Sequence, residues 1–441
     1  MKRNKKILNQ LNASIAGLCE NPENFIVNPE KDFTRNRKLN LYTVIRTLLA
    51  MQNKSLSHEL LEIFGFAPDT PSASAFVQQR AKIKHEAFEQ IFRTFTNSAL
   101  VKFKTYRGYR LLAADGSQIA FSSNPNDPDS FFICKKSNYN LLHLNVMYDL
   151  LNCIYTDAVI QKERRENERA ALVNMVDNST YIGSNVIVIA DRGYESYNTL
   201  AHIQEKGWKF LFRFRNCKTS CILSGFDFPE GEFDIELPLV FTRSRRNIDI
   251  ETAKNDKTFK VLTSQYTFDY LPKVSKDSDE AETYSLNIRF VRFSLSDGSY
   301  EVVATNLDKD DFPPYELKML YSMRWGVETS FRNLKYTVGL LSFHSKKVEY
   351  IFQEIFSRLI MYNFSELITS HVVVQRKNQK YSRKINFSET VLICRNFFLD
   401  KISPQRAEVL ISHHLSPVRP GRHHPRKMKP KGASNFIYRI A

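Results

Sequence analysis

Three acidic residues occupy positions from which their side chains could act together. Asp115 directly follows an apolar stretch at residues 109–114. Asp191 follows a second one at residues 185–190, and Glu328 lies in a stretch of helical composition. Strand ends and an adjoining helix can converge on one point. Taken singly, each aspartate has a plainer explanation, because Asp-Gly-Ser suits a hairpin turn and Asp-Arg-Gly suits the exit of a strand.

The stretch around Glu328 adds cations on the same helical face. Tyr321, Arg324, Glu328 and Lys335 project within roughly 60° of arc at about 100° per residue, on one face of the long helix expected here. A solvated face could carry the same residues, but Glu328 and Lys335 are two turns apart, too far for simple i to i+4 pairing. We interpret the face as one that holds metal through the carboxylate and phosphate through the cations.

These residues resemble the DDE transposases of bacterial insertion sequences, in particular the insertion-sequence-four family. The family signature is Tyr, two residues, Arg, three residues, Glu, six residues, Lys, and the run from Tyr321 to Lys335 is similar to it without a gap. Asp115-Gly-Ser and Asp191-Arg-Gly-Tyr look like the first and second aspartate motifs of the family. The resemblance covers roughly residues 105–365.

The resemblance implies that Asp115, Asp191 and Glu328 are the catalytic metal ligands. Two divalent ions about 3.5 to 4 Å apart can activate a water or 3′-hydroxyl and stabilise the leaving oxygen in phosphodiester cleavage. Hard oxygen ligands suit Mg²⁺, with Mn²⁺ as a substitute.

The resemblance also implies DNA-phosphate contacts by cations and a tyrosine. These residues are Tyr321, Arg324 and Lys335, with Arg192 and Arg332 as further candidates. Trp325 could stack on an unpaired base or belong to the core. Residues 344–347 could extend the phosphate track or form a capped turn between helices. The implied activity is cleavage and strand transfer at insertion-sequence ends, by cut-and-paste.

Composition and charge agree with a nucleic-acid partner. The chain has 441 residues, a formal net charge of +16 and a pI of about 9.4, and such an excess favours a polyanion by counterion release. No run of 18 apolar residues appears, so we expect no membrane segment and a cytoplasmic, nucleoid-associated bacterial protein. Cys217 and Cys221 lack a second pair at zinc-ligand spacing, which favours free thiols.

Hydrophobic periodicity predicts an N-terminal helical domain over residues 1–105. Apolar residues recur at helical spacing over residues 39–51, 56–64, 72–83 and 85–98. The segment 72–84 has small residues first and basic ones later, as in a helix laid against DNA, although a bundle that only packs explains it equally well.

The remaining pattern predicts an α/β fold with a ribonuclease-H-like catalytic core over residues 106–215 and 306–375. Strands are expected at 109–114, 142–148, 152–159, 185–190 and 209–214, and helices at 163–178, 195–206, 315–336 and 348–367. A β-rich module over residues 216–305 interrupts the core, with strands at 286–294 and 300–305.

The last part of the chain, residues 376–441, is expected to hold a C-terminal helix at 388–399 and a basic tail. The 33 residues from 409 contain seven Lys or Arg and no acid, so the tail is either a phosphate-contacting arm or a solubilising extension. The partners expected from mechanism are double-stranded DNA, as terminal repeats and target, and a second copy of the chain in a DNA-bound homodimer.

Rival interpretations remain. A structure-selective nuclease or recombinase would use the same carboxylates without joining ends. A DNA-binding protein derived from a transposase need not keep the complete signature, and a basic RNA-binding protein would carry an RNA-binding motif that this sequence lacks.

Overall fold

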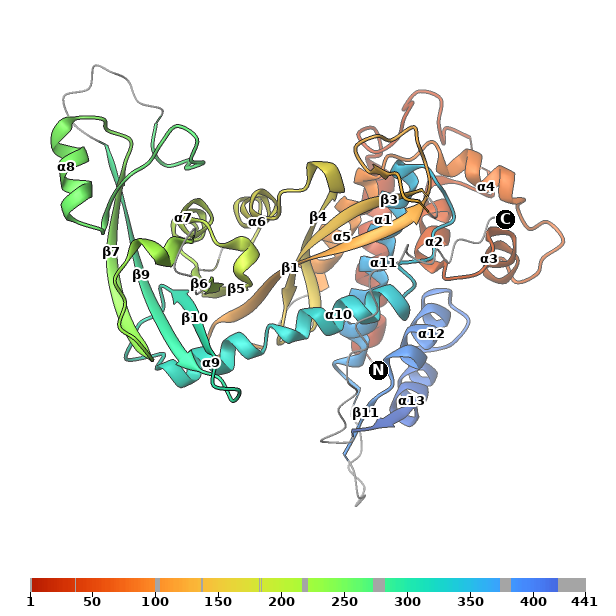
Figure 1. Cartoon of the computed structure of the whole chain (residues 1–441). Helices are drawn as coiled ribbons and strands as arrows, with labels where there is room; N and C mark the ends of the chain where they lie inside the picture. The colour runs from red at the N-terminus through yellow and green to blue at the C-terminus, as the bar shows by residue number, and fades with distance from the viewer. Residues whose placement is uncertain are drawn as a thin grey trace.

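A large mixed sheet forms the centre of the protein in the computed structural model (Figure 1). The structure describes residues 2–35, 37–99, 104–135, 138–181, 183, 185–215, 221–272, 282–372 and 382–418. Within them, the sheet has 10 strands in the order β2-β3-β1-β5-β6-β10-β9-β7-β8, where β2 is the short strand Phe131–Phe132, and β4 is a further partner of β3. Helices pack on both faces, which confirms the expected α/β class.

The first strand is longer than its apolar stretch. β1 spans Arg110–Ser122, and β3 spans Tyr139–Asp149. Asp115 therefore lies inside β1, and the prediction of a strand end or hairpin turn there is wrong. The reason is that β1 leaves its parallel partner β5 (Val186–Ala190) after Ala114, while its antiparallel pairing with β3 continues to Ser122.

The other predicted core strands lie close to their expected positions. β4 spans Ile154–Lys162 and pairs antiparallel with β3, while β6 spans Lys209–Phe214 and pairs parallel with β5. All five residues of β5 are buried, as expected for a central strand covered on both faces.

Helices cover the two faces of these strands. α6 (Glu168–Asp177) and α7 (Tyr197–Glu205) pack on one face, where Leu172 and Leu200 share a core with Val188 of β5. α6 starts later than predicted, because residues 163–165 form the 3₁₀ turn η1 (Glu163–Arg165). The opposite face packs against α9 (Pro314–Ser322).

The β-rich insertion continues the central sheet. β10 (Tyr300–Thr305) pairs with β6, and β9 (Thr283–Ser294) pairs with both β10 and β7 (Phe233–Thr242). Its remaining elements are η3 (Ile222–Gly225), α8 (Asn247–Asn255) and β8 (Phe259–Val261). Figure 1 shows β7, β9 and α8 at the end of the sheet away from the N-terminal helices.

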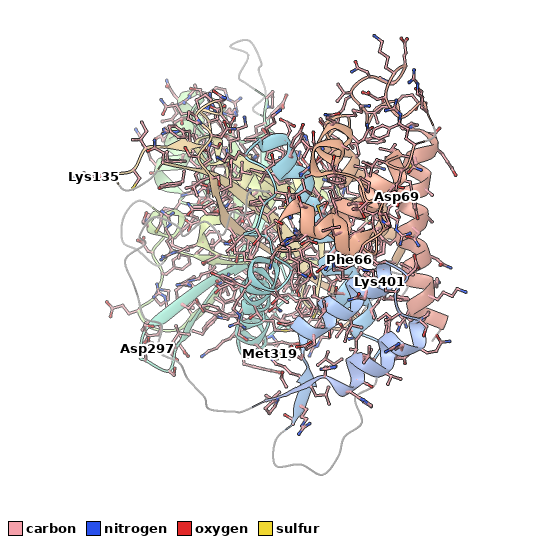
Figure 2. The ribbon with its side chains drawn as sticks, turned by 90° about the vertical axis from the view of Figure 1, so that its right-hand side faces the viewer. Phe66, Asp69, Lys135, Asp297, Met319 and Lys401 are labelled. Atoms are coloured by element: carbon pink, nitrogen blue, oxygen red, sulfur yellow. The ribbon has the colours of Figure 1, made fainter. Side chains whose placement is uncertain are left out.

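The N-terminal helices form a second apolar core with a helix from late in the chain. They are α1 (Lys2–Glu20), α2 (Leu41–Ala50), α3 (Leu56–Ile63), α4 (Ala73–Arg80) and α5 (Glu86–Ala99), packed around α11 (Val348–Thr369). α1 has no counterpart among the predicted helices. Phe66, which follows α3, lies on the outer surface of this helical part (Figure 2).

The basic residues of the segment 72–84 contact the protein itself. Arg80 is 1% exposed, and its guanidinium Nη1 lies 2.8 Å from Glu354 Oε1 while its Nε donates to Gln353 Oε1 over 2.7 Å. Lys84 Nζ donates to the carbonyl of Asn24 over 3.1 Å. The interpretation of Arg80 as a DNA-facing residue is therefore wrong, and packing explains it.

The predicted long helix over residues 315–336 is two helices. α9 ends at Ser322 and α10 runs over Trp325–Tyr336, with Met323 and Arg324 in a turn between them. Hydrogen bonds of the tighter i to i+3 type cross this turn, from the amide of Arg324 to the carbonyl of Tyr321 and from Val327 to Arg324. The prediction that the four signature residues share one face of a single ideal helix is therefore wrong.

The C-terminal part contains more structure than the sequence predicts. α12 (Phe387–Phe398) matches the expected helix, while α13 (Pro404–His413) and the pair β11 (Arg383–Ile385) and β12 (Leu415–Pro417) are additional. The beginning of the predicted tail is thus helix and strand, and residues 419–441 lie outside the described residues. Among the described helices, none combines the length and apolar character needed to cross a bilayer.

Candidate active site

The two aspartates lie at the carboxyl ends of neighbouring parallel segments. Ala114 pairs with Ala190 in the parallel register of β1 and β5, so Asp115 and Asp191 are the next residues on adjacent strands. Asp115 Oδ1 accepts a hydrogen bond from the amide of Gly116 over 2.9 Å, and Asp191 Oδ1 accepts one from Arg192 over 2.7 Å. Asp191 caps the 3₁₀ turn η2 (Arg192–Tyr194).

Arg324 contacts both Glu328, which is the third acid, and Asp115. Its Nη2 donates to Glu328 Oε1 over 3.2 Å, and its Nη1 lies 3.8 Å from Asp115 Oδ2. The guanidinium is only 4% exposed, so its charge is screened less than that of a surface arginine. One cation thus spans two acids that stand far apart in the sequence.

Tyr321 makes the corresponding contact with the second aspartate. Its hydroxyl donates to Asp191 Oδ1 over 3.4 Å. Burial raises the pKa of Tyr321 to about 12, so the phenol remains a hydrogen-bond donor at neutral pH. The turn between α9 and α10 lets Tyr321 and Arg324 reach different acids from adjoining helical ends.

The site holds mutually repelling carboxylates. Burial, followed by smaller contributions from the charges of Glu328 and Glu168, raises the pKa of Asp115 to about 6, although Arg324 and the amide of Gly116 act in the opposite direction. Burial lowers the pKa of Arg324, but Tyr321 and the nearby acids raise it above its ordinary value. Burial is therefore the main cause of the raised Asp115 pKa, and Arg324 is the strongest influence that opposes it.

The remaining predicted site residues lie around this cluster. Lys335 Nζ donates to the carbonyl of Gln118, on β1, over 2.9 Å. Arg192 and Arg332 are exposed. Trp325 is 55% exposed with Arg324 5.4 Å over its ring, so the interpretation of this tryptophan as core is wrong.

His344 belongs to the protein interior. Its Nδ1 lies 3.1 Å from Glu354 Oε2, its Nε2 lies 3.0 Å from the carbonyl of Lys54, and its side chain is 2% exposed. Ser345 Oγ accepts from the amide of Lys347 over 3.0 Å. This is the capped turn between helices, and a phosphate contact by His344 is excluded by its burial.

Sequence reasoning missed several charged residues beside the aspartates. Arg213, on β6, lies 3.8 Å from Asp191 Oδ1 through Nη1 and 3.1 Å from Glu301 Oε1 through Nε. Glu301 belongs to β10. In the sequence, the one feature that could have pointed to these two residues is a charged side chain within an otherwise apolar strand. Of the cysteine pair, Cys217 lies outside the described residues and Cys221 is half-buried, so the prediction of free thiols stays a prediction.

Comparison with known protein families decides what kind of protein this is. The family model described as transposase DDE domain matches residues 106–364, which is more than half of the chain and includes all three acids. The chain belongs to this transposase family. The transposase is also 23% identical over 380 residues to the transposase InsG for insertion sequence element IS4 of Escherichia coli strain K12, covering 81% of this chain and 75% of the relative.

A solved structure also resembles the transposase. The piggyBac transposase in a synaptic complex with hairpin DNA matches with 12% sequence identity and a TM-score of 0.39, over 98% of this chain and 86% of the other. The family and the IS4 relative identify the present enzyme as a DDE transposase of the IS4 type.

Proposed function

We propose that this transposase cleaves and rejoins the ends of an insertion sequence through two divalent ions held by Asp115, Asp191 and Glu328. The observation that carries the proposal is the position of Arg324, which contacts Glu328 and Asp115. The donors are carboxylate oxygens, which suit Mg²⁺ and, as a substitute, Mn²⁺. Because burial and, to a smaller extent, neighbouring acids raise the pKa of Asp115, a bound cation would favour the charged form of this carboxylate.

When bound, such ions lower the pKa of a water or hydroxyl nucleophile and stabilise the charge on the leaving oxygen. The residues of the chain supply position and charge. Arg324 orients Glu328 and presents its other N–H groups toward phosphate oxygens beside the scissile bond. The Tyr321 hydroxyl orients Asp191 and would exchange that carboxylate for a phosphate oxygen when DNA binds. Lys335, Arg192 and Arg332 extend the phosphate contacts.

The strand order supports a ribonuclease-H-like core. β4-β3-β1-β5-β6 begins with three antiparallel strands and continues with two parallel ones, and α6 lies between the antiparallel and parallel parts of the chain. We assign residues 106–215 and 306–375 to this core, 1–105 to a DNA-binding helical domain, 216–305 to the insertion, and 376–441 to the C-terminal helix and tail.

The proposed reaction is cut-and-paste transposition on double-stranded DNA. Joining two ends requires that both be held together, so the active form is a homodimer bound to two terminal repeats and a target. Trp325, exposed next to Arg324, would stack on an unpaired base near the cleaved end. The reaction would take place on the bacterial nucleoid.

The test is cleavage of a duplex that carries the DNA at the border of the element encoding this protein, in Mg²⁺ or Mn²⁺. Glu328→Gln keeps the shape of the side chain and removes its charge. We expect wild type to cut at the border and Glu328→Gln to bind the same duplex but to lose at least about 1000-fold in cleavage rate. Glu349→Gln, an exposed glutamate on α11, is the matched control.

Two results would change the proposal. Equal cleavage by wild type and Glu328→Gln would remove Glu328 from the set of metal ligands. Cleavage by wild type without joining of the cut end to a target duplex would indicate a nuclease on the same fold.

A further inference from the structure

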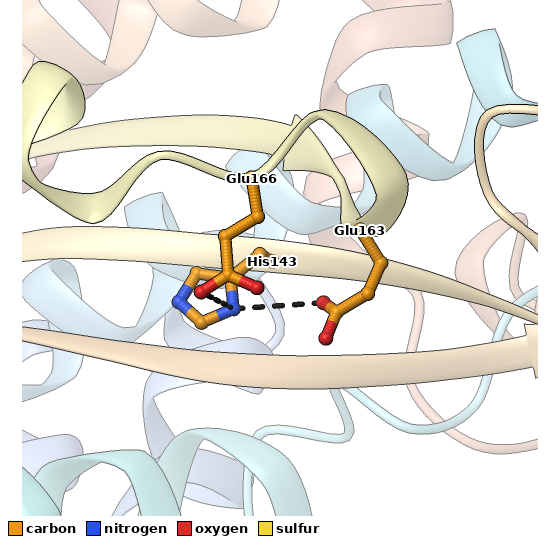
Figure 3. A group of neighbouring side chains, drawn as sticks. All are labelled: His143, Glu163 and Glu166. Atoms are coloured by element: carbon orange, nitrogen blue, oxygen red, sulfur yellow. Dashed lines mark ion pairs between the residues drawn. The ribbon is translucent and has the colours of Figure 1, made fainter.

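A buried histidine and three glutamates lie directly beside the first aspartate. His143, on β3, is 7% exposed, and its Nδ1 lies 3.3 Å from Glu166 Oε1 and 3.6 Å from Glu163 Oε2 (Figure 3). Its Nε2 lies 3.1 Å from Glu168 Oε1. Glu163 lies in η1, Glu168 is the first residue of α6, and Glu166 lies between these elements. The contacts of one imidazole therefore hold this segment against the sheet.

Glu168 reaches further, to both aspartate motifs. A Cβ atom at Gly116, the residue after Asp115, would overlap His143 Nε2 and lie 2.7 Å from Glu168 Oε1. A Cβ at Gly193, two residues after Asp191, would lie 2.9 Å from Glu168 Oε2. Each oxygen of the Glu168 carboxylate therefore occupies a position that a side chain at Gly116 or at Gly193 would block.

Local structure fixes this carboxylate in place. Glu168 is the first residue of α6, where the positive end of the helix favours an acid. Asn167 caps the helix by accepting from the amide of Ala170 over 3.0 Å. Arg169 Nε donates to the carbonyl of Gly193 over 3.3 Å, which ties the helix start to the second aspartate motif.

The ion pair between Glu168 and His143 does not explain why the Glu168 carboxylate also lies against both aspartate motifs. The acid lies between the residues that follow Asp115 and Asp191, and its negative charge contributes to raising the pKa of Asp115. Groups around a metal site orient its ligands and change its affinity, even when they are not direct ligands. A carboxylate placed against both aspartate motifs is suited to a divalent cation.

We propose that Glu168 is a fourth carboxylate of the divalent-ion site, with His143 as the positioning residue that fixes its side chain. The inference rests on the proposed function, because it takes Asp115 and Asp191 as ligands. Its consequence is that Glu168 increases the affinity of the site for Mg²⁺ or Mn²⁺.

The experiment measures Mn²⁺ binding to the full chain without DNA, by calorimetry and by the electron spin resonance of free Mn²⁺. We expect Glu168→Gln to weaken binding about 10- to 100-fold and Asp191→Asn to weaken it at least as much. Asp177→Asn removes the same charge at the other end of α6 and should change the affinity by less than about 2-fold.

A second pair of variants moves the carboxylate without changing its charge. In Gly193→Ala, the new methyl group displaces Glu168 Oε2, its one neighbour within 4 Å, so we expect weaker Mn²⁺ binding here too. In Gly17→Ala, on α1, the methyl group meets nothing within 4 Å, and the affinity should remain that of wild type. These two variants carry the test if Glu168→Gln fails to fold, as judged by its thermal unfolding.

The outcomes separate this inference from the proposed function. If Glu168→Gln or, where that variant does not fold, Gly193→Ala binds Mn²⁺ as wild type does while Asp191→Asn does not, Glu168 has no part in the metal site and the proposed function stands. If Asp191→Asn also binds Mn²⁺ normally, the proposed metal site itself is wrong, and this inference fails with it.

Discussion

Arg324 and Glu328 stand one helical turn apart and are joined by a hydrogen bond of 3.2 Å from Nη2 to Oε1. The arginine also lies 3.8 Å from Asp115. Its position in the turn between α9 and α10 therefore orients the glutamate and neutralises part of the acidic cluster at once. Replacing Arg324 should therefore change the cleavage rate and the metal affinity in different ways.

We expect Arg324→Ala to lower the rate of DNA cleavage at least about 100-fold, because the donors that face the phosphate are lost. Mn²⁺ affinity should stay the same or rise, since a positive charge leaves the site. Arg324→Lys should fall between wild type and Arg324→Ala, because lysine keeps the charge without the planar fork. Lys318→Ala, on α9, is the control. A large loss of Mn²⁺ affinity in Arg324→Ala would contradict this role.

Tyr321→Phe removes only the hydroxyl that donates to Asp191. The contact is long, 3.4 Å, so we expect about a 3- to 10-fold lower cleavage rate, the range of one modest hydrogen bond. Tyr315→Phe removes an exposed hydroxyl from the same helix and should cleave at the wild-type rate. Single-turnover cleavage at saturating enzyme measures both, and equal rates for the two variants would show that the Asp191 contact has no effect.

Asp115 should make the metal-free protein less stable as the pH rises. Its pKa in the folded protein, about 6, lies above the ordinary 3.8. The favourable contribution of the protonated carboxyl is therefore fully present below 3.8 and is lost as the pH rises through about 6. In Asp115→Asn this loss is absent, so the variant should be the more stable protein at neutral pH, by at most about 3 kcal/mol.

Urea unfolding between about pH 5 and pH 8 in a chelator checks this expectation. Asp310→Asn, an exposed acid, should follow the wild-type profile. Mn²⁺ should stabilise wild type above pH 6 and stabilise Asp115→Asn much less. A wild-type stability that does not fall across this range would contradict the raised pKa of Asp115.

Arg80→Ala should destabilise the protein by about 3 to 5 kcal/mol, because it leaves Glu354 charged and buried without this partner. Glu354 lies on α11, so the loss reaches the contact between the N-terminal helices and the late helix. Lys84→Ala, at an exposed site, should change stability by less than about 0.5 kcal/mol. Urea unfolding followed by circular dichroism measures both, and similar midpoints would contradict the buried ion pair.

The sequence predicts the local elements best where composition alone decides them. β6 and β10 have the predicted bounds, since each is an apolar run between breakers. Asp115 could not be placed correctly, because its strand continues through pairing with β3, which is a non-local contact. The break between α9 and α10 has no proline, and the one nearby glycine, Gly326, lies inside α10.

The sequence suggests the three acids of the proposed site but not the residues around them. Asp115, Asp191 and Glu328 follow from motif and spacing. His143 reaches Gly116 only through the register of β1 and β3, in which Gln118 faces His143, and no spacing rule gives that register. Arg213 and Glu301 meet across paired strands in the same way.

The packing of α11 among the first helices affects how the chain folds during synthesis. The helical core also includes buried residues of α12 and α13, so it is complete only after residue 411 has left the ribosome, although its first helix starts at residue 2. Until then, apolar residues of α2 and α5 lack their partners, a situation that favours binding by chaperones. Glu328 also emerges long after both aspartates, so a nascent or prematurely terminated chain lacks one acid of the proposed triad.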